Sequence, residues 1–264
     1  MSQAQKCVLA HFYFYGQAPA RVLHNDAGIQ AVIDSEHGLS ERYNMITVIA
    51  NLKGGSGKST VAFNLAIWLE KNGAEVIGYD LDPQCTFSDL AMLRKEIGND
   101  PQLKIHSVRA VLRDQLLSHT DCEVLVDVGA ANMAAMKEAL TSADRILVPV
   151  PPSQADVWAT QRFLHIIGPD TEAVKLNGNQ RTIAFINRAD TNKSIRETSE
   201  TEEALKMLNG IDVVMKQRLR MRTGFRRSLS EGLAVFEMWP NGKAAEEFGE
   251  FAATLYPHVP ANQN

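Results

Sequence analysis

Short apolar segments recur along the chain from Met45 onward, separated by turn residues and by stretches with helical spacing of apolar positions. Each segment is continuously apolar rather than alternating, which is typical of strands buried on both faces. The order strand, turn, helix, repeated, predicts an α/β fold with a mostly parallel central sheet and helices on both of its faces. The predicted strands are residues 45–50, 75–79, 122–126, 145–150 and 181–186, with a weaker candidate at 213–215.

The first strand, turn and helix are the clearest. Residues 53–57 are rich in glycine, and the helical pattern over 59–72 ends at Gly73, a residue type favoured where helices stop. The last predicted helix, 244–255, is followed by Pro257 and Pro260. These boundaries predict a single α/β domain over residues 45–256 and a C-terminal tail over 257–264.

Residues 1–44 lack this pattern and are interrupted by glycine and proline. We expect them to be a dispensable extension of uncertain order. Because Met45 stands immediately before the first core strand, an upstream misreading of the start codon is an alternative explanation.

Composition narrows the class of protein. The formal net charge of -4 argues against nucleic-acid binding through overall charge, so any such binding requires a local patch. The three cysteines have no CxxC spacing, which favours neither a disulfide framework nor a zinc site and fits a reducing cytoplasm. No apolar stretch approaches the roughly 18 residues of a membrane-spanning helix. The sequence therefore predicts a cytoplasmic protein.

The glycine-rich turn has the pattern of a phosphate-binding loop, because it follows a predicted strand and opens a predicted helix. Glycines let backbone N–H groups approach phosphate oxygens, and the helix N-terminus adds partial positive charge. Lys58 is expected to reach the β- and γ-phosphates and Ser59 to ligate Mg²⁺. The predicted loop comprises Lys53, Gly54, Gly55, Ser56, Gly57, Lys58, Ser59 and Thr60.

One position departs from the standard motif, since Leu52 stands where its first glycine would be and Lys53 follows. The form K-G-G-x-G-K-[ST] resembles the deviant Walker A motif of the ParA/MinD family of P-loop ATPases. The resemblance implies ATP and Mg²⁺ as cofactors, and a Lys53 that crosses a homodimer interface to the phosphates of the partner's nucleotide. Catalysis would then depend on dimerisation. The alternative is that Lys53 is a solvated loop charge.

Two carboxylates follow the second predicted strand, in the sequence Asp80-Leu81-Asp82-Pro83-Gln84. The strand ends of an open parallel sheet are where ligands bind. The resemblance implies that Asp82 orients the attacking water, alongside Lys53 and Lys58 as catalytic residues, and that Asp80 supports either the magnesium shell or the loop geometry. Alternatively, the two aspartates could cap the next helix.

Asp127 ends another apolar segment and matches the aspartate of a Walker B strand, which holds magnesium through a water, while Gly129 lets the loop respond to phosphate. Asn187 and Arg188 follow the predicted strand 181–186, where members of the resembled family recognise adenine with an asparagine. An asparagine after a strand is also common in ordinary turns.

Residues 216–227 form a basic segment without an acidic residue. The candidate contacts to nonspecific DNA are Arg218, Arg220, Arg222, Arg226 and Arg227. Alternatively, these arginines serve a dimer interface or pair with Glu231 and Glu237. The last helix carries Glu246, Glu247 and Glu250, so membrane targeting is not expected.

The resemblance points first to a ParA-type ATPase for DNA partition. In this interpretation ATP drives a sandwich dimer, the dimer binds nonspecific DNA on the nucleoid, and a ParB-like or other adaptor stimulates slow hydrolysis. Three alternatives remain at this point: a positioning ATPase for a non-DNA cargo, a metabolic P-loop enzyme or iron-sulfur reductase, and a pure DNA-binding module.

Overall fold

A computed structural model describes residues 45–111, 113–167, 180–192 and 194–260. The chain divides into two units, Met1–Glu41 and Arg42–Asn264, and the described residues all belong to the second. The predicted extension 1–44 and residues 261–264 of the predicted tail lie outside the described residues.

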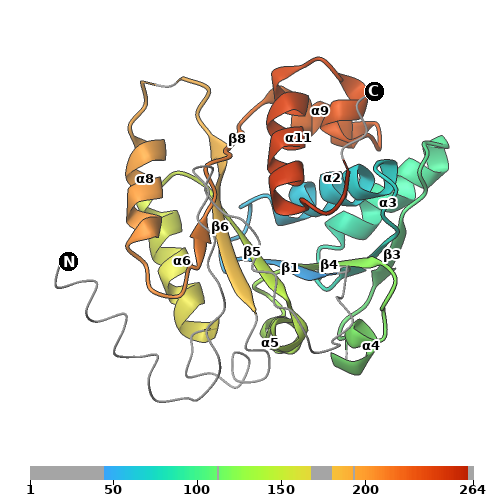
Figure 1. Ribbon diagram of the computed structural model, residues 1–264, viewed down its shortest axis with the longest axis horizontal. Helices are drawn as coiled ribbons and strands as arrows, with labels where there is room; N and C mark the ends of the chain where they lie inside the picture. Colours follow the sequence, from blue (N-terminus) through green and yellow to red (C-terminus); the bar gives the residue numbers. More distant parts are fainter. Residues whose placement is uncertain (1–44, 112, 168–179, 193, 261–264) are drawn as a thin grey trace, which may run out of the picture. The chain divides into compact units, whose positions relative to one another are not determined.

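The strands of the described residues form one eight-stranded sheet in which all neighbouring strands run parallel, as predicted (Figure 1). Its order is β3-β2-β4-β1-β5-β6-β7, and β8 pairs with β6 beyond β7. The strands are β1 Ile46–Ala50, β2 Val76–Asp80, β3 Lys104–Ser107, β4 Glu123–Val128, β5 Arg145–Val150, β6 Arg181–Ala189, β7 Val213–Val214 and β8 Leu219–Arg220.

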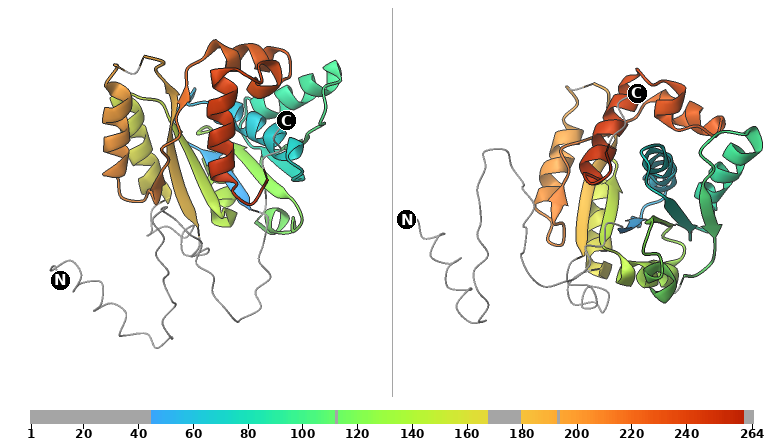
Figure 2. Two further views of the ribbon diagram at one scale, coloured as in Figure 1. Left: turned by 45° about the horizontal axis from the view of Figure 1, so that its top comes forward. Right: turned by 45° about the vertical axis from the view of Figure 1, so that its right-hand side comes forward.

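Helices cover both faces of the sheet, which confirms the predicted layers (Figures 1 and 2). Successive residues of β1 point to opposite faces: Val48 packs in one apolar cluster and Ile49 in the other. One layer is α2 Lys58–Lys71, α3 Thr86–Ile97, α9 Thr223–Ser230, α10 Val235–Met238 and α11 Lys243–Leu255. The other is α4 Arg113–Leu117, α5 Met133–Ser142, α6 Gln154–Ile167 and α8 Glu197–Lys206.

Two strands escaped the sequence analysis for different reasons. β3 lies at the sheet edge and is mostly exposed, so it carries no apolar run. β8 lies inside the basic segment, where apolar Leu219 and Met221 alternate with arginines, and the segment was interpreted only by its charge. Alternation of this kind is the signal of a half-buried strand and could have revealed β8.

The ends of the predicted domain are well defined. Gly73 takes a positive φ of 87° immediately after α2, as expected of a helix stop. At the other end the packed chain continues beyond Tyr256: Val259 is buried, and the His258 Nε2 lies 2.8 Å from Glu123 Oε1. No helix among the described residues is long and apolar enough to cross a bilayer.

Candidate nucleotide-binding site

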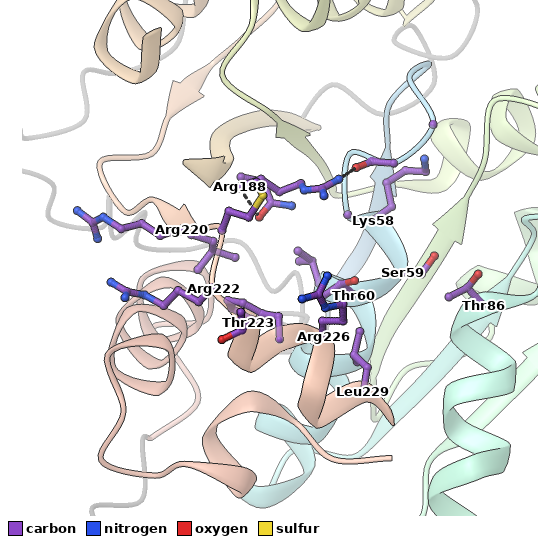
Figure 3. Close-up of a pocket in the computed structure, with 18 of the residues that line it drawn as sticks. Lys58, Ser59, Thr60, Thr86, Arg188, Arg220, Arg222, Thr223, Arg226 and Leu229 are labelled. Atoms are coloured by element: carbon purple, nitrogen blue, oxygen red, sulfur yellow. Dashed lines mark hydrogen bonds between the residues drawn. The ribbon is translucent and has the colours of Figure 1, made fainter. Parts of the chain in front are cut away.

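The candidate site lies at the carboxyl edge of the sheet. Neighbouring strands β2, β4 and β1 end there, so the loops that follow them meet. A cavity of about 880 Å³ opens at this edge. Its walls come from the β1–α2 loop and start of α2, the β2–α3 loop, the end of β6, and the segment from β8 into α9 (Figure 3).

The β1–α2 loop has the backbone of an anion site. Gly55 and Gly57 take positive φ values of 74° and 91°, and Gly57 stands immediately before α2. No side chain caps this helix and no acidic residue lies in its first turn, so its leading N–H groups face the cavity without a side-chain acceptor. The Ser56 hydroxyl is buried and has no hydrogen-bond partner among the described residues.

The two lysines of the loop behave differently. Lys58 is only 6% exposed and lines the cavity together with Ser59 and Thr60. Lys53 does not line it; its Nζ lies 2.7 Å from Oδ2 of Asp156 on α6, whose side chain is 4% exposed. Lys53 is therefore held within its own subunit, away from the cavity that Lys58 lines.

Asn187 and Arg188 brace the loop from the side. The prediction that they follow their strand is wrong, since β6 continues to Ala189. Pairing of β6 with β8 shifts register between Asn187 and Ala189, and Arg188 takes a φ of 59°, which is the geometry of a bulge that turns a side chain outward. Asn187 Nδ2 donates to Ser56 O at 2.7 Å, and Arg188 Nη1 donates to Gly55 O at 2.7 Å.

Both polar atoms of the Asn187 amide have a partner, because its Oδ1 also accepts from the Arg188 N–H at 3.0 Å. A side chain at Gly57 would collide with the Asn187 amide, so only glycine fits between loop and brace. Both Asn187 and Arg188 line the cavity, but these hydrogen bonds serve the loop rather than a base.

Asp80 and Asp82 differ in their surroundings: Asp80 is the last residue of β2 rather than following it, and only Asp82 lies in the loop. Asp80 is buried, and its carboxylate accepts from the N–H groups of Asp82 and Ser88 at 3.1 and 2.9 Å and from the Ser88 hydroxyl at 3.0 Å. These bonds fit support of the loop geometry and of the start of α3. Asp82 lines the cavity, and a Cβ at Gly129 would overlap its carboxylate, so the absence of a side chain there allows its approach.

Asp127 lies directly beside Asp80 in the β2–β4 register and is 0% exposed. Neither of its oxygens has a hydrogen bond of good geometry among the described residues, although the Ser59 hydroxyl interacts with it. Burial raises the pKa of Asp127 to about 7, against the opposing effects of Ser59 and Lys58. A buried carboxylate without a full set of donors is suited to receive a cation.

The residues present fit a magnesium ion that completes its shell with phosphate and water. The side chains of Ser59 and Asp127 offer oxygen atoms as metal ligands. Among the described residues no group of three or more His, Cys, Asp or Glu could hold a metal ion without other ligands. Mg²⁺ is usually held by one or two protein oxygens together with substrate phosphates, rather than by a complete protein cage.

Three arginines of the basic segment form ion pairs with glutamates that the sequence did not suggest. Arg218 pairs with Glu202 on α8, and Arg220 and Arg222 both pair with Glu247 on α11. Although burial opposes its ionisation, hydrogen bonds from Arg222 and Arg220 lower the pKa of the Glu247 carboxyl. The expected partner Glu237 instead binds buried Arg94 at 2.7 Å.

Comparison with known protein families matches residues 47–235, most of the chain, to the CobQ/CobB/MinD/ParA nucleotide binding domain. The chain belongs to this family. The match spans the phosphate-binding loop, the carboxylates, Asn187 and the basic segment, so the ParA/MinD resemblance is confirmed.

Individual members of the family support the same placement. The maintenance of carboxysome distribution protein A of Halothiobacillus neapolitanus is 26% identical over 213 residues, covering 79% of this chain and 95% of that protein. A putative plasmid partition protein of Borrelia burgdorferi B31, bound to AMPPNP, has a TM-score of 0.60 at 19% identity and covers 81% of this chain and 99% of its own.

A third relative holds a metal ion. The cobyrinic acid a,c-diamide synthase of Mycobacterium smegmatis, with bound ADP and magnesium, has a TM-score of 0.61 at 16% identity, covering 84% of this chain and 100% of its own. This structure and the Borrelia structure have the same fold as this chain, although their names indicate different activities.

Within this family fold, three features of the site went unnoticed in the sequence. Asp156, the partner of Lys53, lies 103 residues away from it, so no local pattern joins them. The fit of Gly129 against Asp82 likewise joins two loops. The third feature is the apolar wall that the β8–α9 segment adds, with Leu219, Met221, Phe225 and Leu229. The alternation of apolar residues and arginines around β8 could have revealed Leu219 and Met221.

Proposed function

We propose that the chain is a ParA-type positioning ATPase that binds ATP with Mg²⁺ in the cavity at the carboxyl edge of the sheet. The observation that carries this proposal is the N-terminus of α2, which no described side chain caps. Buried Lys58 lines the cavity there, and the buried carboxylate of Asp127 lacks hydrogen-bond partners among the described residues. The AMPPNP-bound and ADP-magnesium-bound relatives support the choice of ligand.

The roles follow the positions of the side chains. The loop from Gly54 to Thr60 holds the phosphates through backbone N–H groups and Lys58. Ser59 and Asp127 hold Mg²⁺, which supplies charge neutralisation of the phosphates when bound. Asp82 orients the water whose oxygen attacks the terminal phosphorus, so that ADP and phosphate are released. Asp80 fixes this loop from beneath.

The apolar wall of the β8–α9 segment suits the adenine ring, because a purine offers large flat apolar faces. Asn187 contributes by holding the loop carbonyl of Ser56, and Arg188 by holding that of Gly55. We therefore assign both residues to support of the phosphate loop, with their contribution to base recognition limited to the cavity wall that they form.

Lys53 is assigned to the partner's nucleotide in an ATP-dependent homodimer. Its Nζ is engaged with Asp156 rather than with the cavity of its own subunit, so it can act on phosphate only after leaving this ion pair. A cation delivered in this way neutralises charge that develops on the transferring phosphoryl group. Hydrolysis is then coupled to dimerisation and is slow until a ParB-like or other adaptor favours the catalytic arrangement.

DNA partition on the nucleoid is the first candidate process, with the dimer binding nonspecific DNA through the remaining positive charge of the basic segment. Positioning of a non-DNA cargo is the second. The observation that favours the second is the similarity, over 95% of its length, to a protein named for carboxysome distribution.

The proposal is tested by ATPase activity and sedimentation of the full chain, with and without Mg²⁺ and DNA. We expect magnesium-dependent ATP binding and a dimer with ATP. We expect no nucleotide binding by Lys58→Ala, and an ATP-bound dimer without turnover for Asp82→Ala. A wild-type protein that binds no adenine nucleotide with magnesium would refute the proposed function. DNA binding without ATP or salt dependence would refute the partition cycle alone.

A further inference from the structure

The basic segment divides into arginines that are neutralised and arginines that are not. Arg218, Arg220 and Arg222 form ion pairs with Glu202 and Glu247. Arg226 and Arg227, which follow on α9, are exposed, and their guanidinium groups have no hydrogen-bond or ion-pair partner in the part of the chain that the structure describes. Two uncompensated guanidinium groups therefore stand side by side in sequence.

These two neighbours face different surroundings. Arg226 lines the cavity together with Lys58, Ser59 and Thr60, whereas Arg227 does not. Consecutive residues of an α-helix point about 100° apart, so only one of them can face the cavity. Figure 3 shows Arg226 directed toward Thr60 at the start of α2, while the side chains of Arg220 and Arg222 extend the opposite way, toward α11.

The helix that carries Arg226 is anchored before any ligand arrives. Ser228 is buried, Phe225 packs against Phe248 on α11 with ring centroids 6.2 Å apart, and the turn after α9 offers the Gly232 carbonyl to the buried guanidinium of Arg94 at 3.0 Å. The cation is thus presented to the cavity from a preformed support, which lowers the entropic cost of a contact.

We propose that Arg226 binds the phosphate groups of the nucleotide, so that α9 supplies a cation to the site from the face opposite the β1–α2 loop. This inference rests on the proposed function. A guanidinium donates two parallel hydrogen bonds to phosphate oxygens. Among the described residues that line the cavity, Asp82 is the only one with a carboxylate, so the cavity favours a polyanion over a neutral nucleoside. Arg226 therefore belongs to the nucleotide site rather than to a DNA-binding surface.

The test compares the nucleotide affinity of the full-length wild type, Arg226→Ala, Arg226→Lys and the matched neighbour Arg227→Ala by calorimetry. The titrants are ATP with Mg²⁺, ADP with Mg²⁺, and adenosine. We expect Arg226→Ala to weaken nucleotide binding about 10- to 100-fold, the range for one hydrogen-bonded charged contact, and Arg226→Lys to recover part of it. Arg227→Ala should bind nucleotide within about twofold of the wild type, and adenosine should not discriminate among the variants.

The outcomes separate this inference from the proposed function. Absence of ATP binding in the wild type would remove both. Normal ATP binding by the wild type with unchanged affinity in Arg226→Ala would overturn the role of Arg226 alone. Equal losses in Arg226→Ala and Arg227→Ala would overturn it as well, because a general change in surface charge would explain them. Circular dichroism and thermal unfolding of each variant establish that the altered proteins are folded.

Discussion

The ion pair between Lys53 and Asp156 gives the sharpest prediction about the resting protein. The side chain of Asp156 is 4% exposed, its Oδ1 is buried without a hydrogen-bond partner among the described residues, and its Oδ2 is shared by Lys53 and the Ser153 hydroxyl. Removing Lys53 leaves a buried carboxylate without its cation. Loss of one partner from a fully buried pair costs about 3–5 kcal/mol.

The expected cost here is smaller, because Lys53 is 41% exposed and water can partly replace its ammonium group. We therefore expect Lys53→Ala to lower the free energy of unfolding by about 1–3 kcal/mol. Asp156→Asn removes the charge while keeping an amide that the Ser153 hydroxyl can bond. The double variant should then be more stable than Lys53→Ala alone, with a coupling energy of at least about 1 kcal/mol.

The assay is urea unfolding of the nucleotide-free protein for the four members of this cycle, with exposed Lys137→Ala on α5 as the control for loss of a lysine. A Lys53→Ala variant as stable as the Lys137→Ala control would refute the reasoning. So would single-variant effects that simply add in the double variant.

The same pair predicts a functional effect in the opposite direction. Because Lys53 must leave Asp156 to reach a partner's nucleotide, Asp156→Asn should allow ATP-dependent dimerisation at a protein concentration about tenfold lower, if about 1.4 kcal/mol of restraint is removed. Sedimentation with ATP and Mg²⁺ measures this shift. An unchanged dimerisation constant would mean that the ion pair does not restrain Lys53.

Two further predictions concern the carboxylates of the site. In Gly129→Ala the new Cβ would overlap the carboxylate of Asp82 and displace it, so we expect ATP turnover to fall at least about tenfold while ATP affinity is kept. The control is Gly249→Ala on α11, where the new Cβ meets no described atom within 4 Å and should change neither turnover nor affinity. For Asp127, burial raises the pKa from 3.8 to about 7, so the native state keeps a proton that the unfolded chain releases. This group should lower the stability of the metal-free wild type by about 3 kcal/mol between pH 4 and pH 7. Asp127→Asn lacks this loss, so urea unfolding should show its stability relative to the wild type rising over that range; a flat difference would contradict the assignment.

Local patterns were enough to predict the sheet and the phosphate-binding loop. Buried parallel strands are continuous apolar runs, and the glycines of the loop meet a backbone demand that is visible in the sequence itself. Strand β5 was predicted at its observed bounds, and α2 begins one residue before its prediction. The signals of these elements lie in residues that are near one another in the chain, although the strands themselves pair across long separations.

Side-chain partners distant in sequence could not be predicted in this way. The hydrogen bond from Asn187 to the Ser56 carbonyl, 131 residues away, has no counterpart in the sequence pattern. Arg94 reads as a surface residue of a helix, but it is fully buried and reaches Glu237, 143 residues away. Such contacts depend on how strands and helices are brought together, and a single sequence carries no record of that.

The ion pairs of the basic segment limit how many DNA phosphates one subunit can neutralise. Three arginines, Arg218, Arg220 and Arg222, face two glutamates, Glu202 and Glu247, which leaves one net positive charge in this group. Lys216 and Arg227 are exposed and add two further positive charges. Three charges per subunit still neutralise few phosphates, and affinity for nonspecific DNA grows with the number of phosphates contacted. Two such surfaces brought together in a dimer double the number of contacts on one duplex. DNA affinity is thereby tied to the ATP-dependent dimer by charge alone, without any change in the conformation of the segment itself.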